Sequence, residues 1–121
     1  MITIKDIIEF VEENGEYEKL EFLTDIYKHT YTYTVDNYTV YYVTIDKVFS
    51  SNLVLYKNDV MVNNSYIHSR AFCADVELDK LLNKSNSVLE VIDYYYNKRM
   101  KEVSKENEKK RFLNKFMSRD N

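Results

Sequence analysis

The sequence predicts an α+β fold: an N-terminal helix, an antiparallel β-meander of three to five strands, a short helix and a long C-terminal helix. Apolar residues recur with helical spacing only towards the two ends of the chain. Between these ends, threonine, tyrosine and valine alternate in segments that short polar turns separate. A run of strands followed by helices is typical of α+β domains, so we expect the helices to cover the tyrosine-rich face of the sheet.

The first helix is predicted over residues 4–13. Thr3 is an N-cap candidate, and Asp6 stands three residues later, where it completes a capping box. Isoleucine and valine then recur at steps of three and four residues, which indicates one apolar stripe. The Asn14-Gly15 pair is a C-terminal stop signal.

The next two segments predict strands. Residues 17–28 fit both periods; we expect a strand, with a helix as the alternative, because the following strands need partners. Residues 29–46 predict a hairpin around a two-residue turn at Asp36-Asn37. In that register Val35 faces Tyr38, and the core face carries Tyr31, Tyr33, Val35, Tyr38, Val40 and Tyr42.

A second hairpin is predicted over residues 53–63, with its turn at 57–59, and residues 65–72 are a candidate last strand. Asp75 is the N-cap candidate of a short helix over 76–83, in which three leucines are expected to be buried. After a polar connector over 83–87, Ser87 and Glu90 form a second capping box.

The last helix is predicted from about residue 88 towards 118. Its expected apolar seam is Leu89, Ile92, Tyr96, Met100 and Val103. From Ser104 to Arg111 the helix is polar on every side. We therefore expect one globular domain over 1–103 and a projecting basic helix end over 104–121.

Composition excludes several function classes. A single glycine and no proline leave no glycine-rich loop for a phosphate or a dinucleotide. No apolar run approaches the ~18 residues of a membrane span, and the charged N-terminal segment does not fit a signal peptide. Since one cysteine cannot form an internal disulfide, we expect the cytoplasm of a bacterial or other host cell.

Charge is divided along the chain. Residues 98–121 hold nine lysines and arginines against four acids, about +5, whereas residues 1–97 hold eight against sixteen, about −8. Such asymmetry indicates a segment that meets an anionic surface. The candidate partner-binding residues are Lys109, Lys110, Arg111, Phe112, Lys115, Phe116 and Arg119, on an amphipathic helix that also carries Leu113 and Met117.

Tyrosines and acids supply further candidates. At most two residues of the Tyr94–Tyr96 run can be buried together on a helix, so Tyr94 and Tyr95 are candidate interface anchors. An acidic surface is expected at Glu12, Glu13, Glu16 and Glu18. It fits a solvated helix face, a mimic of a phosphate row, or a site for the basic end of the same or a neighbouring molecule.

The sequence gives little support for a catalytic function. His68 and Cys73 are the only pair that suggests a nucleophile and a base, and no recognisable signature surrounds them. Metal-binding spacing is absent from the sequence. We therefore expect no enzyme, no cofactor and no metal.

We expect a small non-enzymatic interaction protein that binds and modulates, most simply by inhibition, another macromolecule. Lys, Asn, Tyr and Ile make up 45 of the 121 residues, a bias typical of AT-rich genomes, which suggests an accessory or anti-defence protein of a phage or mobile element. A protein partner is favoured, because acids at 102, 106 and 108 interrupt the basic run. The alternatives are a nucleic-acid-binding regulator that uses residues 98–119, and a helix-mediated homodimer with a structural role.

Overall fold

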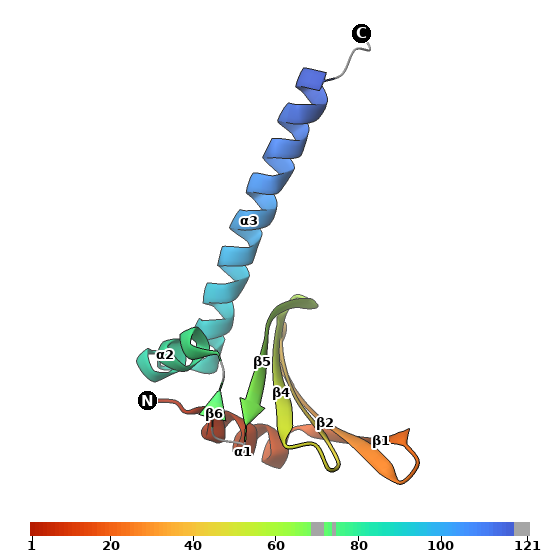
Figure 1. The fold of residues 1–121 in the computed structure, drawn as a ribbon. Coiled ribbons are helices and arrows are strands. Elements are labelled where there is room, and N and C mark those ends of the chain that lie inside the picture. Colours follow the sequence, from red (N-terminus) through yellow and green to blue (C-terminus); the bar gives the residue numbers. More distant parts are fainter. Residues whose placement is uncertain (69–71, 74, 118–121) are drawn as a thin grey trace.

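The computed structural model describes residues 1–68, 72–73 and 75–117, with the side chains of 72, 73 and 117 left aside (Figure 1). It confirms the α+β fold. The elements are α1 (Ile4–Asn14), β1 (Glu16–Leu23), β2 (Ile26–Val35), β3 (Tyr38–Ile45), β4 (Ser50–Lys57), β5 (Val60–His68), β6 (Phe72–Cys73), α2 (Val76–Lys84) and α3 (Val88–Met117).

The strands form one antiparallel meander in the order β1-β2-β3-β4-β5-β6, in which β6 has only two residues. The predicted β2–β3 register is confirmed: Val35 pairs with Tyr38, and Tyr31 pairs with Tyr42. Asp36 adopts the left-handed conformation (φ 52°) that the tight turn requires.

Three predictions for the strand region need correction. Residues 17–28 do not form one strand, because the chain turns at Asp25 (φ 59°) and the two halves pair with each other as β1 and β2. The second turn is shorter than expected: Asn58 and Asp59 are both left-handed, so β4 extends through Lys57. Residues 65–68 continue β5 instead of starting a new strand.

The predicted N-terminal caps of α1 and α2 are confirmed. Thr3 and Asp6 form the reciprocal capping box, and Asp75 accepts a hydrogen bond from the Leu78 N–H. At α3, Ser87 Oγ accepts from the Glu90 N–H at 3.3 Å, but the Glu90 carboxylate accepts from the Asn86 N–H at 3.2 Å. The second capping box is therefore shifted by one residue on its return bond.

All three helices bury their apolar residues against one face of the sheet. The cluster joins α1, the inner face of β3 to β5, α2 and the first turns of α3; its fully buried side chains are Ile4, Ile8, Val11, Tyr42, Leu53, Leu55, Ile67, Leu78, Leu82, Val91 and Ile92. The core face predicted for the β2–β3 hairpin is confirmed, with Val40 and Tyr42 buried and the other tyrosines packed against the cluster.

The seam predicted for α3 is correct only near its start. Ile92 is buried and Tyr96 is half-buried, but Val103 is 41% exposed. Val91 and Tyr95 occupy the core instead, because α3 leaves the sheet after its first turns and rises away from the body (Figure 1). Every residue from 101 to 116 is exposed.

Candidate interaction site

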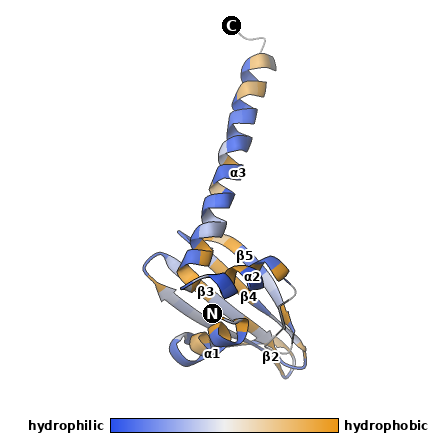
Figure 2. Cartoon of the chain, turned by 90° about the vertical axis from the view of Figure 1, so that its left-hand side faces the viewer, coloured by the Kyte–Doolittle hydropathy of each residue, from blue (hydrophilic) through white to orange (hydrophobic). Residues whose placement is uncertain are grey.

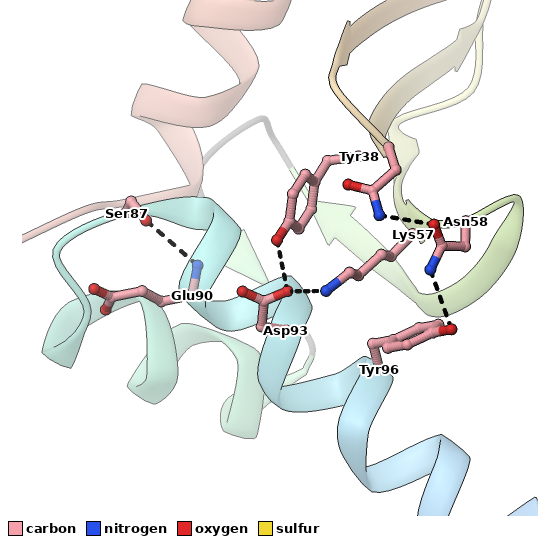
Figure 3. A network of polar contacts seen from close by, with 8 residues as sticks. Tyr38, Lys57, Asn58, Ser87, Glu90, Asp93 and Tyr96 are labelled. Carbon is pink, nitrogen blue, oxygen red and sulfur yellow. Dashed lines mark hydrogen bonds and ion pairs between the residues drawn. The ribbon is translucent and has the colours of Figure 1, made fainter.

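The base of α3 is fixed by a polar network that centres on Asp93 (Figure 3). Asp93 Oδ1 accepts hydrogen bonds from the Tyr38 hydroxyl at 2.7 Å and from Lys57 Nζ at 2.5 Å. Lys57 Nζ also lies 5.1 Å and 5.0 Å from the ring centroids of Tyr38 and Tyr96. Asn58 donates to the Tyr96 hydroxyl at 3.2 Å. The network therefore joins α3 to β3 and to the β4–β5 turn.

Electrostatics keeps this network charged. The hydrogen bond from Lys57 lowers the pKa of Asp93, and the same bond raises the pKa of Lys57. The carboxylate also raises the pKa of the Tyr38 phenol, which stays a donor. Near neutral pH the ion pair is therefore intact, and the direction in which α3 leaves the body is set by folded contacts.

One side of α3 carries a continuous row that we call the lysine stripe. Its members follow at steps of three or four residues, so they share one face of the helix: Tyr94, Lys98, Lys101, Lys105, Lys109, Phe112 and Phe116. Lys98 Nζ lies 4.0 Å from the Glu77 carboxylate of α2. Along the described chain beyond Lys98, no side chain makes an ion pair, so none of the outer lysines is held directly by a carboxylate.

The outer end of the lysine stripe is apolar. Phe112 and Phe116 are 66% and 77% exposed, and their rings stack at 6.0 Å with an interplanar angle of 10°. Leu113 lies beside them and is 41% exposed. These three residues form what we call the apolar tip, which appears as orange segments near the far end of α3 in Figure 2.

The predicted contact residues are not all brought together. Lys109 lies on the lysine stripe and Lys115 lies beside Phe112, but Lys110 and Arg111 point to the other side of the helix, because successive residues turn by about 100°. Tyr94 is 46% exposed, whereas Tyr95 is 8% exposed and lies in the core, where burial raises its pKa. Arg119 lies outside the described residues.

The predicted acidic surface is divided between two sides of the sheet. Glu12 and Glu13 belong to α1, which packs on the inner face. Glu16 and Glu18 pair in register with Thr32 and Thr30, on the opposite face. The four carboxylates therefore do not form one row.

An apolar groove lies between α1, the β2–β3 hairpin and the first turn of α3. Its cavity volume is about 460 Å³, and its wall includes Ile7, Phe10, Tyr33, Val35, Val88 and Leu89. Asp6 is the one charged residue among the described residues that line it. The sequence could not indicate this groove, because three elements from distant parts of the chain build its wall.

A second polar chain joins the edge strand to the sheet. The Tyr17 hydroxyl lies 2.6 Å from His29 Nδ1, and His29 Nε2 lies 2.7 Å from Asp46 Oδ1. The hydrogen bond from His29, followed by that from the Tyr27 N–H, lowers the pKa of Asp46. Because these contacts tie β1 and β2 to the residue that follows β3, we assign them a structural role.

The strand register does not pair His68 with Cys73, the candidate catalytic residues of the sequence. His68 pairs with Phe72, whereas Cys73 pairs with Ile67; the Cys73 side chain is outside the described part. Within residues 1–68, 72–73 and 75–117, no group of three or more His, Cys, Asp or Glu side chains is placed to hold a metal ion. Nor does any described helix combine the length and the apolar character needed to cross a membrane.

Comparison of the chain with protein-family models, with curated proteins and with solved structures gives no match. What the fold and the surface define is an α+β protein with a projecting helix that is anchored at its base. Its exposed chemistry is a row of lysines that ends in an apolar tip.

Proposed function

We propose that the protein is a small non-enzymatic interaction protein, which binds an acidic protein surface through the exposed part of α3 and modulates that partner by covering it. The observation that carries the proposal is the lysine stripe with the apolar tip at its end. Both lie on one helix whose residues 101–116 are all exposed.

The stripe is unfavourable for the isolated molecule. Lys101, Lys105 and Lys109 follow at i, i+4 and i+8, and like charges at this spacing destabilise a helix by about 0.2–0.5 kcal/mol per pair, a cost that Glu102 and Glu108 offset in part. The two phenylalanine rings are left in water, and neither gains from a contact with the domain. An anionic, partly apolar partner would relieve both costs at once.

The arrangement fits a helix that inserts into a groove. In this mode apolar anchors at spacings such as i, i+1 and i+4 enter a hydrophobic groove, and charges on the flanks set orientation and association rate. Phe112, Leu113 and Phe116 have that spacing, and Lys109 and Lys115 flank them. Because α3 is already one continuous helix from Val88 to Met117, binding does not have to form the helix.

A nucleic-acid-binding regulator is the second candidate, and the lysine stripe is the observation that favours it. Four lysines in a row could contact phosphates, and the terminal aromatics could stack on bases. Against it stand the body charge of about −8 and the apolar tip, which phosphate contacts do not need. The more specific form of the leading proposal, a phage or mobile-element protein that inhibits a host or defence factor, rests on residue usage alone.

The test compares two double charge reversals with the same net charge. Lys105→Glu with Lys109→Glu alters the lysine stripe, whereas Lys110→Glu with Arg111→Glu alters the other side of the same helix. In affinity capture from a lysate, the stripe variant should lose the specific protein partners and the control variant should retain them. Equal capture by both variants would contradict the proposal.

Nucleic acid is tested on the same proteins. Fluorescent duplex and single-stranded DNA and RNA are titrated at low and moderate salt. Phosphate contacts release counterions, so binding through the stripe would weaken steeply as salt rises. Steep, stripe-dependent binding would replace the leading proposal with the second candidate.

A further inference from the structure

The apolar groove has the chemistry that the apolar tip of α3 requires. Ten of its lining residues are aliphatic or aromatic, and they expose almost no polar surface. Its volume of about 460 Å³ lies within the range of about 300–1,000 Å³ that is usual for ligand-binding cavities. A helix that offers two aromatic rings and a leucine is a suitable occupant.

The α1 side of the groove carries carboxylates, and lysines flank the apolar tip. The Asp6 carboxylate lines the groove, and Glu13 lies two turns further along the same side of α1. Lys109 and Lys115 flank the apolar tip, so the carboxylates on the α1 side of the groove can attract it.

The tip cannot reach the groove of its own molecule. Leu89, in the first turn of α3, forms part of the groove wall, whereas Phe112 lies 23 residues further along the same helix. At about 1.5 Å per residue these positions are roughly 35 Å apart. The straight course of α3 away from the body is visible in Figure 1. Only a second molecule can therefore supply the tip.

We propose that the apolar groove binds the apolar tip of α3 from a second copy of this chain. The inference rests on the role of the tip proposed above and names one acidic surface that the tip fits. If each copy offers both its groove and its tip, two contacts related by a two-fold axis close a dimer.

The test uses one variant for each side of the contact. Phe10→Lys places a cation in the groove wall; Phe10 is 47% exposed, so the change leaves the buried face of α1 intact. Phe112→Ser with Phe116→Ser removes the tip. The matched control is Phe22→Lys in β1, where the phenylalanine is 54% exposed and lies outside the groove. Circular dichroism and thermal unfolding establish that each variant folds.

Sedimentation velocity over a range of protein concentrations measures self-association. The full chain and the Phe22→Lys control should form dimers, whereas the groove variant and the tip variant should each weaken dimerisation at least tenfold. An equimolar mixture of these two variants retains one intact groove and one intact tip, so dimers should reappear in the mixture. A non-specific aggregate would not show this complementation.

Two results would overturn the inference. One is a full chain that stays monomeric at the highest concentration reached; the other is a dimer that Phe10→Lys does not weaken. Neither result bears on the capture of other proteins by the lysine stripe, which is measured separately. If the Phe112→Ser, Phe116→Ser variant keeps both its dimer and its captured partners, the proposed function fails as well.

Discussion

Removal of the outer part of α3 should leave the stability of the domain almost unchanged. The perturbation is a chain that ends at Val103. Every residue from 104 to 116 is exposed, and none of the described residues in this segment forms a hydrogen bond or ion pair with the body. Changes confined to such a surface alter the free energy of unfolding by about 0.5 kcal/mol or less. For a domain of this size that corresponds to a shift of about 2–4 °C in the melting temperature.

If the outer part of α3 packed on the body, truncation would cause a much larger loss of stability. If Phe112 and Phe116 packed onto their own domain, each ring would contribute about 1.5–3 kcal/mol, and truncation would lower the free energy of unfolding by several kcal/mol. Urea unfolding followed by circular dichroism separates the two cases, with the midpoint as the readout. Protein concentration is kept low, since self-association would add stability through mass action. A loss above about 2 kcal/mol at low concentration would refute the projecting helix.

Three further predictions concern the body. Tyr42 is fully buried and its hydroxyl has no hydrogen-bond partner among the described residues, so Tyr42→Phe should stabilise the protein by about 1 kcal/mol; a lower urea midpoint would contradict this. A Cβ at Gly15 would lie 2.5 Å and 2.9 Å from two backbone carbonyl oxygens, so Gly15→Ala should destabilise by about 1–3 kcal/mol in the same assay. Lys57 lowers the pKa of Asp93. The stability that this ion pair contributes is therefore present above the unfolded pKa of about 3.9 and is lost as the pH falls through the lower pKa of the folded state. Between pH 5 and 2.5 the native chain should therefore lose more stability than Asp93→Asn, and parallel pH profiles would show that the pair contributes nothing.

Much of the fold could be predicted from interactions between residues that lie close together in the sequence. The alternation of tyrosine with threonine and the Asp36-Asn37 turn determine both register and core face in the β2–β3 hairpin, because a shift of one residue would turn every tyrosine of the core face to solvent. The caps at Thr3 and Asp75 likewise depend on nearby residues only. The turn at Asp25 was not predicted because the β-branched Thr24 favours a strand, whereas both residues of the Asp36-Asn37 turn tolerate a positive φ.

Features that depend on packing between distant elements were not predictable in this way. The spacing of apolar residues on α3 continues to Val103, but the sheet ends earlier, and only the fold determines where the helix loses its partner. The lysine stripe was present in the sequence as steps of three and four residues. The run of three adjacent cations at 109–111 is the more conspicuous pattern in the sequence, but a helix distributes these three side chains around its axis.

The fold gives the uneven distribution of charge along the chain a physical consequence. A positive helix and a negative body on one flexible chain would neutralise each other, but the Asp93 network holds α3 pointing away from the groove. The outer lysines and the apolar tip are thereby kept apart from the acids and the apolar surface of the body. The attraction can then be satisfied only between molecules. A partner protein and a second copy would compete for the same tip, with concentration deciding between them.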